Sequence, residues 1–323
     1  MPQRWVGRSR VTLWRAVAAA LLLAMLGGTV QLDPGRGADR AVAATAAAAA
    51  RLALAGDEAA RPVASTAAYV ESLGGNASWQ TGTVALPADD AADRFEPRVY
   101  VYVAHRQDDG QWTAALEGTA EFQPLATEAL AVLSGTVSGD LLATTVQSSG
   151  SGSAALSLPW ATGKAWRLTG GPHHFRGGGS RPWSSLDFAG PTPGVSTKVR
   201  AARGGVVVRP CANLVQIRHG DGWTTSYYHL KNIAVRAGQS INRGQVIGYT
   251  SKRAGCGGYA TGKHVHFSLL KSGSYVNIRG HAIGGWTVKE GSSSYKGCLV
   301  KGDKKRCAPN GSIYNNGSIG DGD

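Results

Sequence analysis

From residue 155 onward, the sequence consists of short runs of alternating or β-branched residues separated by glycine-rich turns. Such runs are typical of β-strands, whose successive side chains point to opposite faces of a sheet. In "NLVQIRHGDGWTTSYYHL" an Asp-Gly turn lies between two of these runs and predicts a hairpin. No segment of this half has a 3.6-residue apolar stripe long enough to indicate a helix. We therefore expect residues 155–308 to form a mainly antiparallel β domain, followed by a polar C-terminal tail, residues 309–323.

The N-terminal half predicts a different organisation. Four arginines precede the apolar run at residues 16–26, and glycines and small residues follow it. This is the pattern of a secretory signal peptide, which we place at residues 1–43. The chain is then expected to be secreted and extracellular, with no membrane segment in its mature form. Residues 44–154 predict a small α+β unit that ends in a flexible Gly/Ser-rich linker.

The two halves carry opposite charges. Residues 44–154 contain five arginines, no lysine and thirteen acidic residues, a net charge of −8. Residues 155–323 contain twenty-three basic and six acidic residues, a net charge of +17. A basic surface suits nucleic acid, an anionic membrane or an acidic cell-wall polymer, and an exported protein meets the last of these most often.

All four cysteines lie in the C-terminal half. An even number of cysteines in an oxidising compartment indicates disulfides, and four cysteines allow three pairings. A four-thiolate zinc site is disfavoured because the sequence has no Cys-x-x-Cys pair. We favour the pairs Cys211–Cys256 and Cys298–Cys307, of which the second closes a short loop.

The histidines concentrate in the same half. Seven of the eight lie within residues 173–281, namely His173, His174, His219, His229, His264, His266 and His281. His264 and His266 are two residues apart in the predicted strand "HVHFSLL", so both side chains point to one face of it. For an isolated His-x-His the simplest interpretation is a solvated polar face. The rest of the chain has to decide between this interpretation and a functional site.

Carboxylates are scarce around these histidines. Between residues 155 and 289 the only two are Asp187 and Asp221, and Asp221 occupies a hairpin turn that favours an aspartate for backbone reasons. This composition excludes an HExxH protease and disfavours a pair of glycosidase carboxylates. A Ser-His-Asp triad is also disfavoured, because this segment contains no Gly-x-Ser-x-Gly elbow.

A metal site made of two histidines and one aspartate fits this composition better. Catalytic zinc is usually held by three protein ligands, with the fourth position open to water. The stretch "TGGPHHFRGGGSRPWSSLDF" offers a histidine and Asp187, and His266 adds a third ligand from the predicted strand. His264 then lies beside the metal, and His229, in "SYYHL", is a further candidate for a position near the metal.

The motifs "TGGPH…SSLDF", "SYYHL" and "TGKHVHFSL" closely resemble those of the lysostaphin-like zinc endopeptidases of bacterial cell walls. The beta-lytic metalloendopeptidase branch is the most similar, since it shares the "GWTTSYYHL"-like strand and both cysteine spacings. The resemblance covers roughly residues 156–308. It implies one Zn²⁺ per chain, with the metal ligands His173, Asp187 and His266 and the catalytic residues His229 and His264. The motif Gly-Gly-x-His points to His173, although His174 follows immediately.

The resemblance also implies a function. We expect a secreted, bacteriolytic zinc endopeptidase that hydrolyses peptide bonds next to glycine or alanine in bacterial peptidoglycan. The acidic N-terminal region would be a pro-segment that binds the basic domain of its own chain, and we expect a monomer. The main alternative is a non-catalytic cell-wall binding protein with the same fold. A nucleic-acid binder explains the charge but neither the histidines nor the export, so we expect no nucleic-acid partner.

Overall fold

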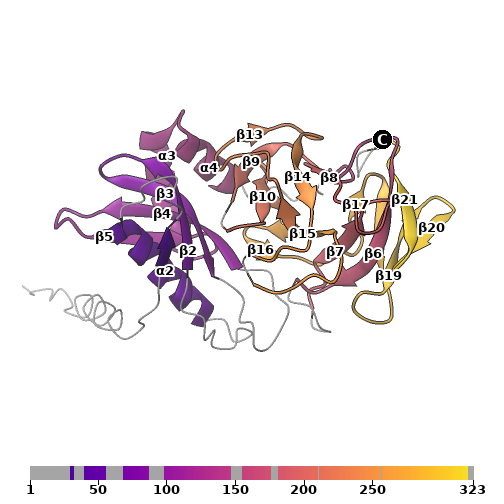
Figure 1. The fold of residues 1–323 in the computed structure, drawn as a ribbon. Coiled ribbons are helices and arrows are strands. Elements are labelled where there is room, and N and C mark those ends of the chain that lie inside the picture. The colour runs from indigo at the N-terminus through magenta and orange to yellow at the C-terminus, as the bar shows by residue number, and fades with distance from the viewer. Residues whose placement is uncertain are drawn as a thin grey trace, which may run out of the picture.

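A computed structural model of the chain describes residues 30–32, 40–55, 68–86, 98–146, 155–175, 181–209, 211–255 and 257–318. They form an N-terminal module and a β domain that lie side by side (Figure 1). The predicted signal peptide, residues 1–43, lies mostly outside the described residues. None of the described helices has both the length and the apolar character needed to cross a bilayer.

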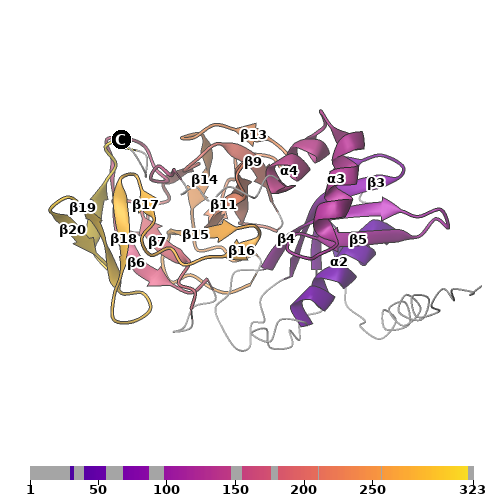
Figure 2. The same cartoon turned by 180° about the vertical axis from the view of Figure 1, so that it is seen from behind.

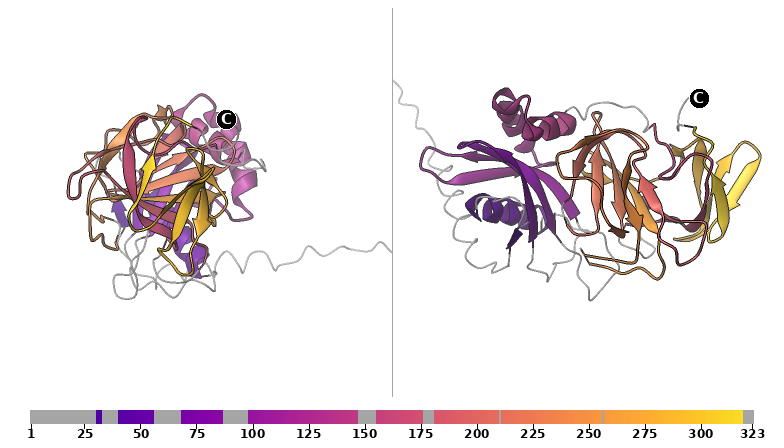
Figure 3. Two further views of the ribbon diagram at one scale, coloured as in Figure 1. Left: turned by 90° about the vertical axis from the view of Figure 1, so that its right-hand side faces the viewer. Right: turned by 45° about the horizontal axis from the view of Figure 1, so that its top comes forward.

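The N-terminal module is a five-stranded sheet covered by helices on both faces (Figure 3). Its strands, in sheet order, are β1 (Val30–Leu32), β2 (Ala68–Gly75), β3 (Trp79–Leu86), β4 (Arg98–Arg106) and β5 (Trp112–Leu116). Its helices are α2 (Arg40–Ala55), α3 (Phe122–Leu133) and α4 (Val137–Val146). The β1–β2 pair is parallel and the other pairs are antiparallel. The predicted small α+β unit is therefore confirmed.

Strand β4 shows how one alternating sequence serves both faces of this sheet. Val101 and Val103 pack with the buried residues of α3 and α4, whereas Tyr102 and Ala104 pack with those of α2. A strand buried on both faces reads as a nearly continuous apolar run, as "VYVYVA" does. The predicted cleavage point after Ala43 lies inside α2, where Ala43 is fully buried. The boundary at residues 43 and 44 therefore stays a prediction.

The β domain contains three antiparallel sheets, and no residue from 155 onward in the described part of the chain is helical. The largest sheet has the order β13 (Ser240–Ile241), β9 (Gly205–Val208), β10 (Val215–Arg218), β11 (Trp223–Tyr228), β15 (Val265–Lys271), β7 (Ser185–Ala189), β6 (Ala165–His173) and β21 (Gly311–Tyr314), with β16 (Ser274–Tyr275) paired to β15. The predicted mainly antiparallel β fold is confirmed.

The two smaller sheets flank this one. One has the order β12 (Leu230–Lys231), β14 (Val246–Thr250) and β8 (Lys198–Arg200). The other has the order β17 (Ala282–Ile283), β18 (Trp286–Glu290), β19 (Gly297–Lys301) and β20 (Lys304–Cys307). Seen from behind, this four-stranded sheet lies at the end of the molecule farthest from the N-terminal module (Figure 2).

One large hydrophobic core holds these sheets together. The rings of Trp160 and Trp166 stack in it at 5.1 Å, and Phe188 meets Trp160 edge-on. The strand residues that face this core alternate with residues that face the other side of the large sheet, where the histidines lie. In β15, for example, Val265 and Phe267 belong to the core, whereas His266 between them does not.

The C-terminal boundary of the β domain needs correction. Residues 309–323 were predicted to be a polar tail, but β21 pairs with β6 and extends the large sheet. Ile313 is fully buried, and the Asn315 side chain donates a hydrogen bond to the Trp160 carbonyl at 2.6 Å. A single apolar residue among polar ones gives too weak a pattern to predict this strand.

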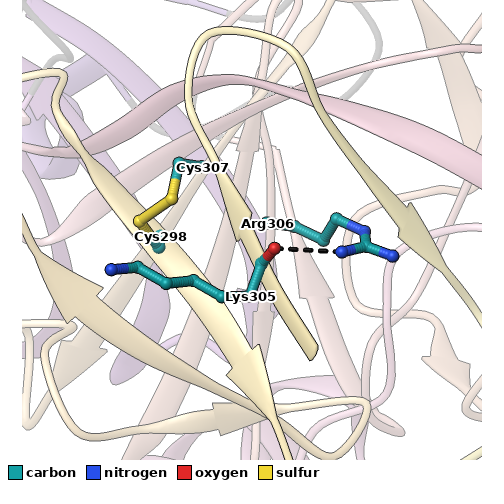
Figure 4. Close-up of a disulfide and its surroundings, with 4 residues drawn as sticks. All are labelled: Cys298, Lys305, Arg306 and Cys307. Carbon is teal, nitrogen blue, oxygen red and sulfur yellow. Dashed lines mark hydrogen bonds between the residues drawn. A yellow bond between two sulfur atoms is a disulfide. The ribbon is translucent and has the colours of Figure 1, made fainter. Parts of the chain in front are cut away.

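The disulfide Cys298–Cys307 is present and joins β19 to β20 (Figure 4). The two cysteines lie opposite each other in the register of these strands. Cys256, the predicted partner of Cys211, lies outside the described residues.

We expect His219, in the β10–β11 hairpin, to make the folded chain less stable in mild acid. Its Nδ1–H donates to the Gly204 carbonyl at 2.7 Å, and burial lowers its pKa from 6.5 to about 4. Between these two values the unfolded chain binds a proton at this residue and the folded chain does not, so stability falls as the pH falls. The full effect is about 3 kcal/mol at this shift.

Urea denaturation of wild type and His219→Gln at about pH 7 and about pH 4.5 measures this effect, since the pH range covers most of the interval between the two pKa values. We expect the variant to be less stable at neutral pH but to lose less stability on acidification. An equal acid-induced loss in both proteins would assign the effect to other groups.

Candidate metal centre

Three adjacent strands of the large sheet bring His173, Asp187 and His266 together. Asp187 lies opposite His266 in the β7–β15 register, and His173 ends β6 after a register shift. Asp187 Oδ1 is 3.0 Å from His266 Nδ1 and 3.6 Å from His173 Nε2. One ligand atom from each residue lies within 4.8 Å of the other two. This combination of two imidazoles and one carboxylate is the donor set that catalytic zinc prefers.

Gly170 explains why the predicted Gly-Gly-x-His motif contains a glycine at this position. It lies opposite Asp187 in the β6–β7 register. A Cβ atom at residue 170 would lie 2.5 Å from Asp187 Oδ2, too close for a non-bonded contact. Only a residue without a side chain leaves room for the carboxylate, so the motif shapes the site rather than the turn. The donors of the cluster therefore fit a metal ion, and Gly170 leaves room for the carboxylate among them.

A hydrogen bond to a backbone carbonyl fixes the ring orientation of His173. Its Nδ1–H donates to the Gly171 carbonyl at 2.7 Å. Because that nitrogen carries the proton, the lone pair lies on Nε2, which faces His266 Nδ1 at 3.2 Å. This is the tautomer that a metal ligand requires.

The neighbouring histidines keep Asp187 ionised. Burial alone raises the pKa of this carboxyl group, but the imidazoles of His173 and His264 outweigh burial and hold its pKa well below the usual value. An ionised carboxylate is the form that binds a cation.

His229 and His264 complete a group of five polar residues. His264 immediately precedes β15, and its Nε2 lies 3.4 Å from Asp187 Oδ1. His229 immediately follows β11, and its ring centroid is 4.9 Å from that of His264 and 6.3 Å from that of His266. Both lie beside the His173, Asp187 and His266 cluster without belonging to it.

The same kind of backbone contact orients these two rings. His229 Nδ1–H donates to the Arg253 carbonyl at 2.9 Å, and His264 Nδ1–H donates to the Gly262 carbonyl at 2.9 Å. In the neutral form of each ring, the lone pair then lies on Nε2. His229 has a left-handed backbone (φ 62°), and its carbonyl accepts hydrogen bonds from the backbone N–H and the hydroxyl of Ser251.

The two rings differ in their electrostatic surroundings. Burial, with the nearby His264 and His266, lowers the pKa of His229 to about 3, so this ring is neutral at physiological pH. Burial acts the same way on His264, but Asp187 outweighs it and raises the pKa of His264 above 6.5. One neutral and one more basic imidazole therefore lie side by side.

Comparison with known proteins agrees with this geometry. Residues 181–278 match the family model described as Peptidase family M23. Over 147 residues, 43% of this chain, the sequence is 34% identical to the beta-lytic metalloendopeptidase of Lysobacter enzymogenes and covers 82% of that protein. The chain belongs to peptidase family M23.

Two further relatives match this M23 chain over the same half. Protease LasA of Pseudomonas aeruginosa is 37% identical over 147 residues, which are 43% of this chain and 35% of LasA. The chain thus spans about a third of LasA's length. The solved structure of the M23 metalloprotease pseudoalterin, from the deep sea, is 29% identical, with a TM-score of 0.47 over 51% of this chain and 99% of that one.

His173 and His174 have different surroundings in this M23 chain. His173 takes part in the metal-ligand cluster, whereas the His174 ring packs against Phe175 at 4.4 Å. We therefore expect His173→Ala to lose the bound metal and all hydrolysis, and His174→Ala to keep both. Metal content by mass spectrometry and fragment release from peptidoglycan measure the two effects. Loss of the metal in His174→Ala alone would move the ligand by one position.

Tyr295 is a residue of the site that the sequence does not predict. Its ring stacks on His173, with centroids 4.0 Å apart and planes within 17°. Its backbone is left-handed (φ 67°), and it exchanges hydrogen bonds with Gly171 and Pro172. The stretch "SSSYKG" has no pattern that indicates this contact, because the loop comes from a different sheet.

The remaining histidines have structural surroundings. His219 is buried in its hairpin, and His281 meets Trp223 edge-on at 5.1 Å. His105, in the N-terminal module, packs against Trp79 at 4.1 Å. None of the three belongs to the five-residue group.

Proposed function

We propose that this M23 chain is a zinc-dependent endopeptidase that hydrolyses peptide bonds next to small residues in bacterial peptidoglycan. The observation that carries the proposal is the group of five residues on one face of the large sheet. Three of them, His173, Asp187 and His266, form a metal-ligand set, and His229 and His264 lie beside it. A cell-wall binding protein would not need two further histidines beside a metal site.

The proposed roles of the five residues rest on their geometry and their electrostatic surroundings. When bound, zinc supplies a Lewis acid that polarises a carbonyl group and lowers the pKa of water. His173, Asp187 and His266 would hold it. His229 is neutral and has an acceptor lone pair on Nε2, so it is suited to take a proton from the attacking water. His264, whose pKa is raised, is suited to donate a hydrogen bond to the developing oxyanion.

Purified peptidoglycan of known cross-linking provides the test. The chain, with its metal content measured, should release soluble fragments, and mass spectrometry of their new termini should identify the cleaved bond. Release should stop when a chelator removes the metal and return when zinc is added. A metal-loaded chain that binds the walls but releases no fragment would favour the non-catalytic binding protein.

We also propose that the chain is exported and that residues 44–154 act as its pro-segment. The basic signal-like N-terminus and the net charges of −8 and +17 on the two halves motivate this proposal. The acidic Glu117 of the module also makes a direct ion pair with Arg218 of the β domain. A chain that hydrolyses peptidoglycan equally well before and after cleavage of the Gly/Ser-rich linker, residues 148–155, would contradict the inhibitory role.

A further inference from the structure

The large sheet has one face in the hydrophobic core and one face that carries the metal-ligand cluster. Residues opposite each other in antiparallel strands point to the same face. Because Tyr228 lies opposite His266, Ser226 opposite Ser268, and Gln216 opposite Ser226, a polar row continues on this face from β15 to β10. Arg218, two residues beyond Gln216, points the same way. We call Gln216, Ser226 and Arg218 the β10–β11 polar row.

The N-terminal module packs directly on this face. Arg218 donates from Nη1 to Glu117 Oε1 at 2.6 Å, and its Nη2 lies 2.6 Å from Oε2. The two side chains are only 3% and 5% exposed. Val208, opposite Gln216 in the β9–β10 register, shares a buried cluster with Leu73 and Val101 of the module. The module thus covers the part of the sheet that extends away from the metal centre.

Within the covered area, the polar side chains of Gln216 and Ser226 are buried without hydrogen-bond partners in the described part of the chain. Gln216 and Ser226 are both fully buried. Neither the Gln216 amide nor the Ser226 hydroxyl has a hydrogen-bond partner in the described part of the chain. Buried polar groups in folded proteins nearly always have partners, so such a pair needs an explanation. A surface that binds a polar ligand once the module has left provides one.

We propose that the β10–β11 polar row is a substrate subsite for a carboxylate-bearing part of the peptide, and that Glu117 occupies it in the full chain. Bidentate pairing with a carboxylate is the geometry that a guanidinium group prefers, and Glu117 already has it. The Gln216 amide and the Ser226 hydroxyl offer donors and acceptors for a peptide backbone. This inference rests on the proposed endopeptidase function, which it deepens.

The register places this subsite at a definite distance from the metal. Arg218 lies opposite Thr224, four residues from Tyr228, and β10 is two strands from β15. These steps amount to about 16 Å along the sheet, which extended peptide spans in about five residues. The recognised carboxylate should therefore lie about five residues from the cleaved bond.

Release of the module tests the proposal without requiring hydrolysis. A protease site inserted in residues 147–154 lets the folded full chain be cut, and a fluorescent label on the module reports its release. The probes are two extended peptides that differ only in a carboxylate or an amide at the proposed position. We expect the carboxylate peptide to release the module at a concentration about tenfold to about a hundredfold lower. Equal concentrations for both peptides would overturn the proposal.

A double variant keeps the test valid if a single variant fails to fold. Arg218→Met alone leaves Glu117 buried and unpaired, whereas Glu117→Leu/Arg218→Met replaces the ion pair by apolar side chains of similar size. In the cut double variant, both peptides should release the module at the same concentration. The matched control, Glu128→Gln/Arg306→Met, changes two exposed charges, of which the second lies in β20 at the end of the molecule farthest from the module (Figure 2), and should keep the wild-type difference.

Hydrolysis provides a second readout. After cutting, wild type should cleave the carboxylate peptide with a kcat/KM about tenfold to about a hundredfold above that of the amide peptide. The double variant should cleave the two peptides with equal kcat/KM. If neither peptide is cleaved while the release difference persists, the endopeptidase function fails and the subsite stands. If the double variant keeps the wild-type preference, the subsite is wrong.

Discussion

Replacing Asp187 with alanine should abolish both metal binding and peptidoglycan hydrolysis. Asp187 Oδ1 is the one acceptor that faces His173, His264 and His266 together, at 3.6, 3.4 and 3.0 Å. Without this carboxylate the site keeps two neutral donors and no negative charge to balance a divalent cation. Loss of an outer-shell partner lowers metal affinity about 10- to 100-fold, and loss of a direct ligand should exceed this. His266→Ala should behave in the same way.

The chain offers a matched control for this prediction. Asp221 is the only other carboxylate between residues 155 and 289, and it pairs with Arg203 at 2.8 Å in the β10–β11 hairpin. Asp221→Ala should keep stoichiometric metal and activity. Metal content after gel filtration, and fragment release from peptidoglycan, give the two readouts. Stoichiometric metal in Asp187→Ala would show that the ligand set is wrong.

The fold could be predicted where the sequence pattern is local. The alternation in "HVHFSLL" and the Asp-Gly turn in "HGDGW" correspond to β15 and the β10–β11 hairpin. Strand β21 could not be predicted, since its pairing with β6 is decided by Ile313, 147 residues along the chain from its partner Trp166. A single apolar side chain gives no periodicity, and only the finished sheet shows that it is needed.

The residues of the candidate site also fall into two groups, those that local sequence features predict and those that only long-range contacts bring together. His264 and His266 share a short motif, so their proximity to each other follows from strand geometry. Asp187 was singled out because so few carboxylates surround it, which is a matter of composition. Tyr295 and Glu117 reach their partners across long sequence separations, 101 residues for Glu117 and Arg218. Contacts between separate sheets or modules leave no periodic signal in a sequence.

Replacing His264 or His229 with alanine should abolish hydrolysis and leave the metal in place. Both rings have a proton on Nδ1, fixed by backbone carbonyls, and neither belongs to the ligand set. General acid–base groups contribute about 10²- to 10⁴-fold to a rate, so we expect losses of this size. Metal content and peptidoglycan fragment release, measured on the same preparations, separate this outcome from ligand loss.

The His264 variant is the more demanding half of this prediction, because its Nε2 lies within 3.4 Å of the ligand carboxylate. Its imidazole helps to lower the pKa of Asp187, so its removal should weaken metal binding slightly without preventing it. His281→Ala, which removes an imidazole that packs on Trp223, should change neither property. If His264→Ala lost its metal as completely as His266→Ala, the division of this strand into one catalytic residue and one ligand would be wrong. If it kept both metal and activity, His229 would have to act alone on the attacking water.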